Sequence, residues 1–281
     1  MIEQAEKVDF FEGTDEEERR ANSPPETIRY FDLIAEKHRG RRRGAVNPVK
    51  TETTDPPTLT RMVKDTAREL GANLVGVAGV DQAFVYKGKH VAHKYAVSLG
   101  MEMDYGRMAT APSPESSIEV ARVYYELGET TIRLAEYIRS LGYDAHSHHP
   151  LGGGDVLLIP FAIAAGLGEL GRNSLVTSRE FGPRFRLGCV TTDIPLLMDD
   201  PVDLGVSGFC RKCQACLKAC PVGAIPESPG RVRGIEKYTI DGPSCRPYCN
   251  QPNGCAVCIK VCVFNQLAHR GKWLEVGQAT A

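Results

Sequence analysis

Residues 209–221 read FCRKCQACLKACP, and this stretch organises the interpretation of the whole chain. Its cysteines follow the spacing C-x2-C-x2-C-x3-C-P, which is typical of bacterial ferredoxins that bind two iron–sulfur clusters. Two intervening residues let the backbone wrap around a cubane, so the first three thiolates can bind the same cluster. The fourth cysteine of such a run ligates the other cluster, and the run therefore predicts a second cysteine set downstream.

Five further cysteines C-terminal to this run provide such a set. They are Cys245, Cys249, Cys255, Cys258 and Cys262. Because the last cysteine of a run crosses to the other cluster, we expect two mixed ligand groups. The first comprises Cys210, Cys213, Cys216 and Cys262, and the second comprises Cys220, Cys255, Cys258 and one upstream cysteine. Cys245 and Cys249 compete for that last place.

Disulfides and structural zinc explain these cysteines less well. Nine of the ten cysteines fall in the last 72 residues at ferredoxin-like spacing, and we see no secretory leader before them. Structural zinc uses paired C-x2-C knuckles, whereas the third cysteine at x2 and the C-P ending favour iron. The tenth cysteine, Cys189, lies in an apolar stretch and is expected to be a buried, inert thiol.

The composition is that of a globular protein without a dominant charge. Of 281 residues, 42% are hydrophobic, which suffices for one sizeable core and a small appended module. The 34 basic and 35 acidic residues create no field that would favour nucleic acid or an anionic membrane. No apolar run reaches the roughly 18 residues that a membrane helix needs. We expect a cytoplasmic protein, with membrane association or export as the alternative if a leader precedes this sequence.

Hydrophobic periodicity predicts helices alternating with strands. The expected helices cover residues 59–70, 114–141 and 160–165. The expected strands cover residues 73–80, 95–103, 143–149 (an edge strand) and 186–192. This alternation indicates an α/β sandwich. Gly128 marks a point where the longest helix can divide, since glycine is about 1 kcal/mol less favourable than alanine inside a helix.

The chain divides into three expected regions. Residues 1–57 are charged and proline-rich and are expected to form an extended arm with one short helix near residues 26–37. Residues 58–200 carry the α/β sandwich. Residues 201–281 form the ferredoxin-like module and a C-terminal tail.

The sandwich ends in a glycine-rich segment, residues 158–195, LIPFAIAAGLGELGRNSLVTSREFGPRFRLGCVTTDIP. Its G-x-G-x-x-G at Gly166, Gly168 and Gly171 follows a helix-like stretch rather than a strand, so it is weak evidence for a dinucleotide. Followed after a spacer by FCRKCQACLKACPVGAI, the segment closely resembles the cobalamin-dependent reductive dehalogenases. It is similar, less closely, to their relatives the epoxyqueuosine reductases. The resemblance runs from about residue 58 to the end of the second cysteine set.

The resemblance implies a nitroreductase-like cobalamin-binding domain and two [4Fe–4S] clusters that carry electrons to a base-off corrinoid. It favours Cys245 over Cys249, because the family's second set begins ten or more residues before its C-x2-C pair. The residues that it places at the cobalamin are Gly168, Leu170, Gly171, Arg172, Asn173, Ser174, Leu175, Phe185, Thr191 and Thr192.

The resemblance also implies catalytic residues. In the helix VYYELGETTIRLAEYIRSLGY, residues 123–143, Tyr124 matches the family tyrosine best and Tyr125 is the alternative. A tyrosine can donate a proton when a neighbouring cation lowers its pKa. Arg184 and Arg186 occupy the stretch where the family carries a basic residue facing the substrate, and both would share one face of a strand. The alternatives are that the tyrosine is an aromatic residue of the core and that the two arginines are an ordinary pair on the surface.

The histidine cluster HSHH at residues 146–149 fills the position where the dehalogenases carry an asparagine or a lysine. Either His148 or His149 can hydrogen-bond or protonate a substrate near neutral pH. The alternative is that both are exposed histidines on an edge strand. The epoxyqueuosine reductases place a catalytic aspartate in this region, which disfavours them as the nearer relatives here.

Together these features predict a reductive dehalogenase that cleaves the carbon–halogen bond of a small organohalide. The alternatives are a tRNA-modifying enzyme similar to epoxyqueuosine reductase and a non-catalytic corrinoid or iron–sulfur electron carrier. We expect a low-potential electron donor, such as a ferredoxin or flavoprotein, and no nucleic-acid partner. A homodimer is a further alternative for the assembly of the protein.

Overall fold

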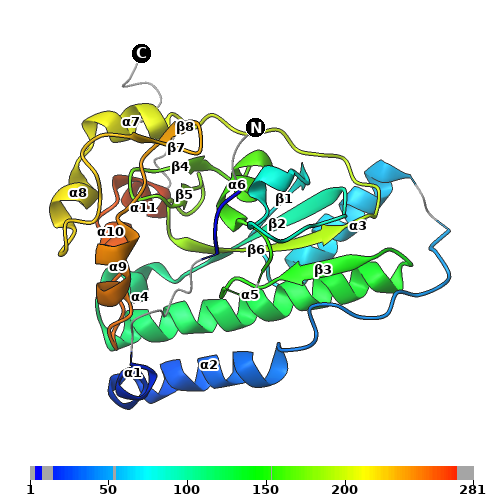
Figure 1. Cartoon of the computed structure of the whole chain (residues 1–281), viewed down its shortest axis with the longest axis horizontal. Helices are drawn as coiled ribbons and strands as arrows, with labels where there is room; N and C mark the ends of the chain where they lie inside the picture. Colours follow the sequence, from blue (N-terminus) through cyan, green and yellow to red (C-terminus); the bar gives the residue numbers. More distant parts are fainter. Residues whose placement is uncertain (1–3, 8–14, 53–54, 153, 271–281) are drawn as a thin grey trace.

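An antiparallel sheet forms the centre of this computed structural model, which describes residues 4–7, 15–52, 55–152 and 154–270 (Figure 1). Its four strands lie in the order β1, β2, β6, β3. They are β1 (Leu74–Gly79), β2 (Tyr95–Glu102), β3 (Ala145–His148) and β6 (Phe185–Thr192). Val97 of β2 is paired with Val77 on one side and Val190 on the other. β3 lies at an edge of the sheet, as predicted.

Helices cover both faces of this sheet. α3 (Pro56–Glu69) and α5 (Pro114–Ser140) pack on one face, and α6 (Leu158–Ala164) packs on the other (Figure 1). Successive residues of β2 alternate between the two faces, so Ala96 joins the core beneath α6 and Val97 joins the core beneath α3 and α5. The α/β sandwich predicted from the sequence is confirmed.

The predicted helices and strands are present, with ends shifted by a few residues. Shorter elements complete the sandwich: η1 (Gln82–Phe84), α4 (Tyr105–Ala109), β4 (Glu169–Leu170) and β5 (Val176–Thr177). Cys189 is fully buried, as expected for an inert thiol, and burial raises the pKa of this thiol. Within the described ranges, no helix combines the length and the apolar character needed to cross a bilayer.

α5 runs unbroken through 27 residues, so the expectation that Gly128 divides it is wrong. A reciprocal capping box between Ser113 and Ser116 starts the helix, and Pro114 occupies its first turn. Gly128 has a packing role instead. A Cβ atom at this position would lie 2.0 Å from Nε2 of His149, so the missing side chain makes room for the histidine ring.

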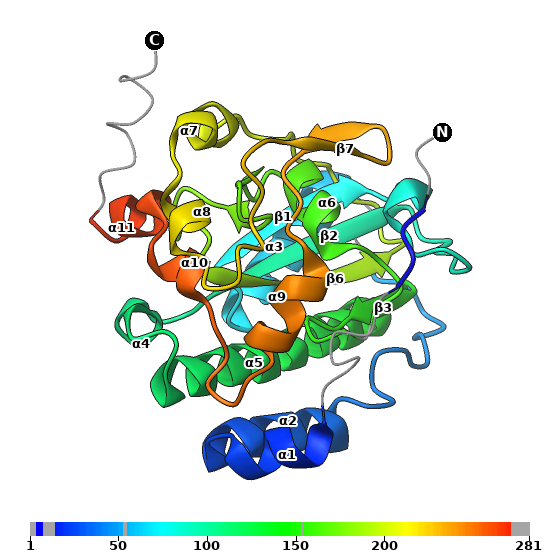
Figure 2. The ribbon, with the colours of Figure 1, turned by 60° about the vertical axis from the view of Figure 1, so that its left-hand side comes forward.

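The N-terminal arm contains two helices where we expected one. α1 (Glu16–Asn22) begins at Asp15, whose carboxylate accepts a hydrogen bond from the Glu18 amide. This N-cap was the available sequence signal for the additional helix. α2 (Pro25–Lys37) lies along the outer side of α5, as both views show (Figures 1 and 2). A buried contact of 3.2 Å between the Thr27 and Ser117 hydroxyls joins α2 to α5.

The C-terminal module packs against one end of the sandwich (Figure 2). Its elements are α7 (Val206–Lys212), α8 (Ala215–Ala219), β7 (Gly230–Val232), β8 (Ile235–Lys237), α9 (Gly242–Cys249), α10 (Val257–Lys260) and α11 (Val263–His269). The predicted tail beyond residue 270 lies outside the described residues. The boundaries assigned to the three regions stay predictions.

Replacing Gly128 with alanine is expected to lower the free energy of unfolding by about 1–3 kcal/mol, the usual cost of overpacking a filled core. Gly208→Ala in α7 is the matched control, because a Cβ atom there would meet nothing within 4 Å. Alanine favours a helix over glycine by about 1 kcal/mol, so the control is expected to be neutral or slightly stabilising. Urea denaturation of both variants would test this difference, and equal midpoints would contradict it.

Candidate active site

Two adjoining cavities lie where the sandwich meets the module. The first, of about 270 Å³, is lined by residues of the N-terminal arm, α5 and the module, and is called the module cavity. The second, of about 390 Å³, is lined largely by residues 149–159 and the start of β6, and is called the loop cavity. Tyr124, Leu175 and Arg186 line both. These three residues therefore stand at the junction of the two cavities.

Tyr124 and Arg186 are in direct contact at this junction. Tyr124 comes from α5 and Arg186 from β6, and the guanidinium carbon of Arg186 lies 4.8 Å from the centroid of the Tyr124 ring. A cation over an aromatic face is attracted by the ring quadrupole. The Nε atom of Arg186 is buried and has no hydrogen-bond partner among the described residues. The structure thus brings together the two residues that the sequence singled out, with a hydrogen-bond donor of Arg186 uncommitted.

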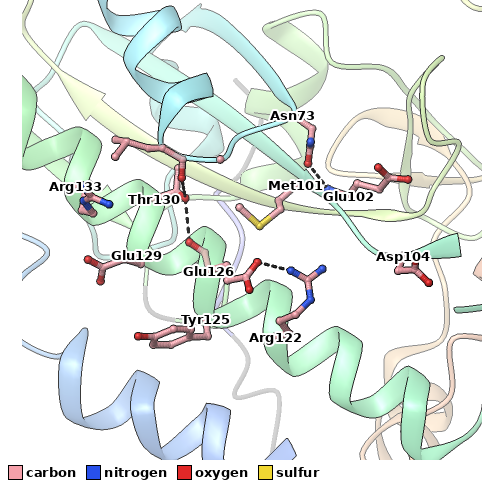
Figure 3. A pocket seen from close by; sticks show the side chains of 12 residues that line it. Asn73, Met101, Glu102, Asp104, Arg122, Tyr125, Glu126, Glu129, Thr130 and Arg133 are labelled. Atoms are coloured by element: carbon pink, nitrogen blue, oxygen red, sulfur yellow. Dashed lines mark hydrogen bonds and ion pairs between the residues drawn. The ribbon is translucent and has the colours of Figure 1, made fainter. Parts of the chain in front are cut away.

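Tyr125 points to a different side of α5 from Tyr124, because consecutive helix residues lie about 100° apart. It lines an open, polar depression of about 570 Å³ together with Glu126, Glu129 and Arg133 (Figure 3). Its ring stacks on that of His38, with the ring centroids 5.0 Å apart and the planes inclined by 12°. This depression is called the outer depression. Tyr124 lines the interior cavities and Tyr125 does not.

Arg184 is a structural residue, which corrects the expectation that both arginines face the site. Its guanidinium is buried and lines neither cavity in the described part of the chain. It donates to the Asn265 side-chain oxygen at 2.9 Å, to the Glu102 carboxylate at 2.5 Å, and to the Met103 carbonyl. Arg184 immediately precedes β6, and its side chain joins the end of β2 to α11.

The two candidate histidines are buried rather than exposed, and their ring nitrogens are occupied. Nε2 of His148 lies 2.9 Å from the Thr191 hydroxyl, and its Nδ1 accepts from the Asp155 amide at 3.3 Å. Nδ1 of His149 accepts from the Leu151 amide at 3.0 Å, and its Nε2 lies 2.9 Å from Nδ1 of His38. Burial lowers the pKa of His149 to about 3.

A role of either histidine as a direct proton donor to substrate is therefore not supported. His149 lines the loop cavity, whereas His148 lines neither cavity among the described residues. The lowered pKa of each ring means that both are neutral near pH 7. A neutral ring with both nitrogens engaged has no proton to offer to the cavity.

His146, His148 and Asp155 form the one histidine and carboxylate group with metal-binding proximity found in the described ranges. Their ligand atoms lie within 4.8 Å of one another. Arg43 already places a cation there, because its guanidinium lies 3.4 Å from Nε2 of His146 and 3.3 Å from the Asp155 carboxylate. Since both His148 nitrogens are also engaged, this group is complete without a metal ion.

The module cysteines line two separate cavities. Cys210, Cys213, Cys216 and Cys262 line one small cavity. Cys220, Cys245, Cys249, Cys255 and Cys258 line the module cavity. Burial raises the pKa of Cys216 to about 11 and that of Cys262 to about 12, because a desolvated thiolate is unfavourable. Such sites need compensating positive charge, which fits the donor set of an iron–sulfur cluster.

Cys245 and Cys249 both line the module cavity. After burial itself, the negative charges of Cys255, Cys216, Cys245 and Cys220 raise the pKa of Cys258. Burial and the charges of Cys245 and Cys255 raise the pKa of Cys249 to about 11, and Arg186 opposes this rise. The choice of Cys245 as the last ligand stays a prediction.

Only some of the residues that the resemblance placed at the cobalamin line the cavities. Asn173, Leu175 and Phe185 do. All the guanidinium donors of Arg172 instead point to backbone carbonyls of the module. The remaining six also line neither cavity in the described ranges: Gly168, Leu170, Gly171, Ser174, Thr191 and Thr192.

Thr191 and Thr192 lie near the far end of β6, where their hydroxyls contact His93 and the Asp144 carbonyl. The N-terminal arm also reaches the site. Thr27 and Phe31 of α2 line the module cavity. The prolines and charges of the arm indicated an extended segment, and the contact depends on tertiary packing against α5.

Comparison with known proteins agrees with the architecture of this site. No protein-family model matches the sequence. The tetrachloroethene reductive dehalogenase of Dehalobacter restrictus is 31% identical over 267 aligned positions, which cover 74% of this chain and 48% of that protein. The epoxyqueuosine reductase of Escherichia coli is 27% identical over 269 positions, covering 77% of this chain and 68% of that protein.

Solved structures give the same ranking. A catabolic reductive dehalogenase superimposes with a TM-score of 0.87 and 25% identity, covering all of this chain and 45% of that one. A reductive dehalogenase described as B12-dependent gives a TM-score of 0.85 at 25% identity, covering 99% and 45%. An epoxyqueuosine reductase shares the fold with a TM-score of 0.55 and 19% identity, covering 75% and 67%.

The mixed α/β fold and the cysteine-rich module define the class as that of the reductive dehalogenases and their relatives the epoxyqueuosine reductases. Within this class the chain is a homologue of the reductive dehalogenases in both sequence and fold, and the epoxyqueuosine reductases are more distant relatives. The chain spans about half the length of the curated dehalogenases that it matches.

The two arginines at the start of β6 are expected to differ in their effect on stability. Arg184→Met leaves the Asn265 oxygen and the Met103 carbonyl without a donor, and each such buried acceptor costs about 1–3 kcal/mol. We expect the free energy of unfolding to fall by about 2–4 kcal/mol. Arg186→Met removes no hydrogen bond within the described residues and is expected to change it by at most about 1 kcal/mol.

Urea denaturation of the two methionine variants, without added cofactors, measures this difference. Methionine keeps the length of the arginine stem in both cases, so the comparison isolates the guanidinium. A larger loss of stability for Arg186→Met than for Arg184→Met would contradict the structural role of Arg184.

Proposed function

We propose that the protein is a reductive dehalogenase, which replaces a halogen of a small organohalide by hydrogen with two electrons and one proton and releases halide. The observation that carries the proposal is the Tyr124–Arg186 contact at the junction of the two cavities. A proton donor and a cation meet there, and the cysteines of the second group line one of the two cavities. The similarity to tetrachloroethene and catabolic reductive dehalogenases supports this assignment.

The residues present fit the two cofactors that the family implies. The eight thiols of the two groups provide two complete four-cysteine donor sets for [4Fe–4S] clusters. Leu175 and Phe185, together with Asn173, offer a largely apolar wall with one amide for a base-off cobalamin. When bound, the cobalamin supplies a strongly reducing metal centre for carbon–halogen cleavage, and the clusters supply its electrons singly.

The side chains at the junction then have separate tasks. Tyr124 donates the proton to carbon as the halogen leaves. The Arg186 cation stabilises the phenolate that remains and offers its unpaired Nε hydrogen to the departing anion. The neutral His149 ring shapes the wall of the loop cavity. A low-potential ferredoxin or flavoprotein serves as the electron donor.

The alternatives have less support. An enzyme similar to epoxyqueuosine reductase would place an aspartate in the site, but Asp144 lies beside His93 and Asp155 beside Arg43. Neither aspartate lines the two cavities in the described ranges. A non-catalytic electron carrier would bind the clusters yet release no halide, so turnover separates it from the proposal.

Tyr124→Phe is expected to lower kcat for halide release by about 10²-fold or more, since a positioned proton donor typically contributes 10²–10⁴-fold. The protein would be reconstituted anaerobically with iron, sulfide and cobalamin and supplied with a low-potential donor and a panel of organohalides. Tyr137→Phe on the same helix is the control and is expected to keep full activity. Loss of turnover in Tyr125→Phe but not in Tyr124→Phe would reverse the assignment, and no halide from the parent protein would sink the proposal.

Replacing single cysteines is expected to identify the last ligand of the second cluster. Cys245→Ala should reduce the iron content from about eight to about four per chain, because three thiolates hold a [4Fe–4S] cluster poorly. Cys249→Ala should keep about eight. Iron and acid-labile sulfide analysis after reconstitution measures both. The reverse pattern would assign Cys249 as the ligand.

A further inference from the structure

A row of polar contacts connects the outer depression to the wall of the loop cavity. The row begins at Glu129, which lines the outer depression (Figure 3). Oε2 of Glu129 lies at an ion-pair distance of 3.4 Å from Nε2 of His38, and Nδ1 of His38 is hydrogen-bonded to Nε2 of His149 at 2.9 Å. Nδ1 of His149 accepts from the Leu151 amide at 3.0 Å. His38 is fully buried and His149 is 1% exposed.

These contacts determine where each proton sits. Because an amide N–H can only donate, Nδ1 of His149 carries a lone pair and its proton is on Nε2. That proton points to Nδ1 of His38, which must accept it. The remaining proton of His38 is therefore on Nε2, the nitrogen nearest the Glu129 carboxylate. Nε2 makes no hydrogen bond among the described residues, so its contact with Glu129 is electrostatic. One tautomer of each ring satisfies the two hydrogen bonds of His149.

Packing holds the two rings in this arrangement. Gly128 leaves space for the His149 ring, and Tyr125 stacks on His38. Arg41 fixes Glu129 from the other side, with its NH1 nitrogen 2.8 Å from Oε2. His38 directly follows α2, so this residue of the N-terminal arm contacts a histidine that lines the loop cavity.

We infer that His38 and Glu129 are positioning residues for the site: they hold His149, and through it the backbone at Leu151, as the wall that shapes the loop cavity. The inference rests on the proposed function for its effect on turnover, although the row itself does not. Leu151 lines the module cavity, and His149, Pro150 and Gly152 line the loop cavity, so the position of this segment affects both cavities. The N-terminal arm is thereby a part of the active site.

Burial and the nearby cations keep both rings neutral. Arg41, Arg42 and Lys37 lower the pKa of His38 and Glu129 raises it, whereas His38 and Arg42 both lower the pKa of His149. Desolvation is the largest effect on both rings and lowers the pKa of His38 from its ordinary value of 6.5. An added proton has no acceptor in the row: on His38 Nδ1 it would meet the His149 proton, and on His149 Nδ1 it would meet the Leu151 N–H. The neutral form is thus lost only as the pH falls below 6.5.

Two variants of His38 test the inference. His38→Asn keeps an acceptor at the position of Nδ1 but cannot take up a proton, whereas His38→Leu has no acceptor. His90→Leu, at an exposed position, is the control. We expect His38→Leu to speed hydrogen–deuterium exchange of the Leu151 amide at least tenfold and to lower kcat for halide release roughly tenfold or more, as small displacements in a site do. His38→Asn and the control should stay within about threefold of the parent.

The pH dependence adds a result that a merely structural role would not produce. In the parent protein, exchange of Leu151 should accelerate below pH 6.5 beyond the intrinsic pH effect, and in His38→Asn this additional acceleration should be reduced. If His38→Leu does not fold, this comparison decides the matter. Unchanged Leu151 exchange in a folded His38→Leu, or identical pH profiles of parent and His38→Asn, would overturn the inference.

The exchange measurement also separates this inference from the proposed function. If the parent protein releases no halide, the proposed function falls. Faster Leu151 exchange in His38→Leu, with normal exchange in His38→Asn, would still establish the row. If the parent turns over and His38→Leu matches it in exchange and kcat, the function stands and the inference falls.

Discussion

The burial of Arg172 is the constraint on which the relation between sandwich and module depends. Its guanidinium donates to the carbonyls of Cys210, Arg211, Pro226 and Glu227, and its Cζ lies 4.3 Å from the Tyr238 ring centroid. A buried cation is very costly unless all its donors are engaged. Here the guanidinium nitrogens of Arg172, a residue of the glycine-rich segment, all donate to carbonyls of the module. The carbonyls of Cys210 and Arg211 belong to the last turn of α7, where a cation is favourable.

This arrangement has a consequence for electron transfer. Arg172 fixes the backbone of Cys210, the first residue of the first cysteine group, relative to the segment that continues into β6. Gly182, with a φ of +57°, lets the next turn approach α11 so closely that a Cβ atom would lie 2.6 Å from the Asn265 amide. Arg184 then binds the Asn265 side chain. Three contacts along one short segment therefore hold the cysteine groups at a set position against the strand that carries Arg186.

Local patterns predicted the elements, and tertiary contacts decided what each polar residue does. The hydrophobic periodicity of α5 and the alternation of β2 reflect burial on one face or two, so both elements could be predicted from the sequence alone. The cysteine groups could also be predicted, because the spacing of ligands along the chain is a local property. The different roles of Arg184 and Arg186 could not be predicted from the sequence. The two residues carry the same charge in the same short stretch, and they differ only in the residues that pack against them. For the same reason nothing in the sequence linked His38 to His149, which are 111 positions apart.

The distribution of satisfied and unsatisfied groups finally identifies where chemistry can occur. A buried polar group that is fully hydrogen-bonded within the protein has no capacity left for a ligand. Arg172, Arg184, His148 and His149 are committed in this way. Arg186 keeps one buried N–H without a partner among the described residues, beside the Tyr124 ring at the junction of the cavities. Because leaving such a donor unpaired costs about 1–3 kcal/mol, a ligand that accepts from it recovers that energy on binding. Arg186 is therefore the residue that would bind an anionic or electron-rich ligand, at the point where the proposed function has the halide leave.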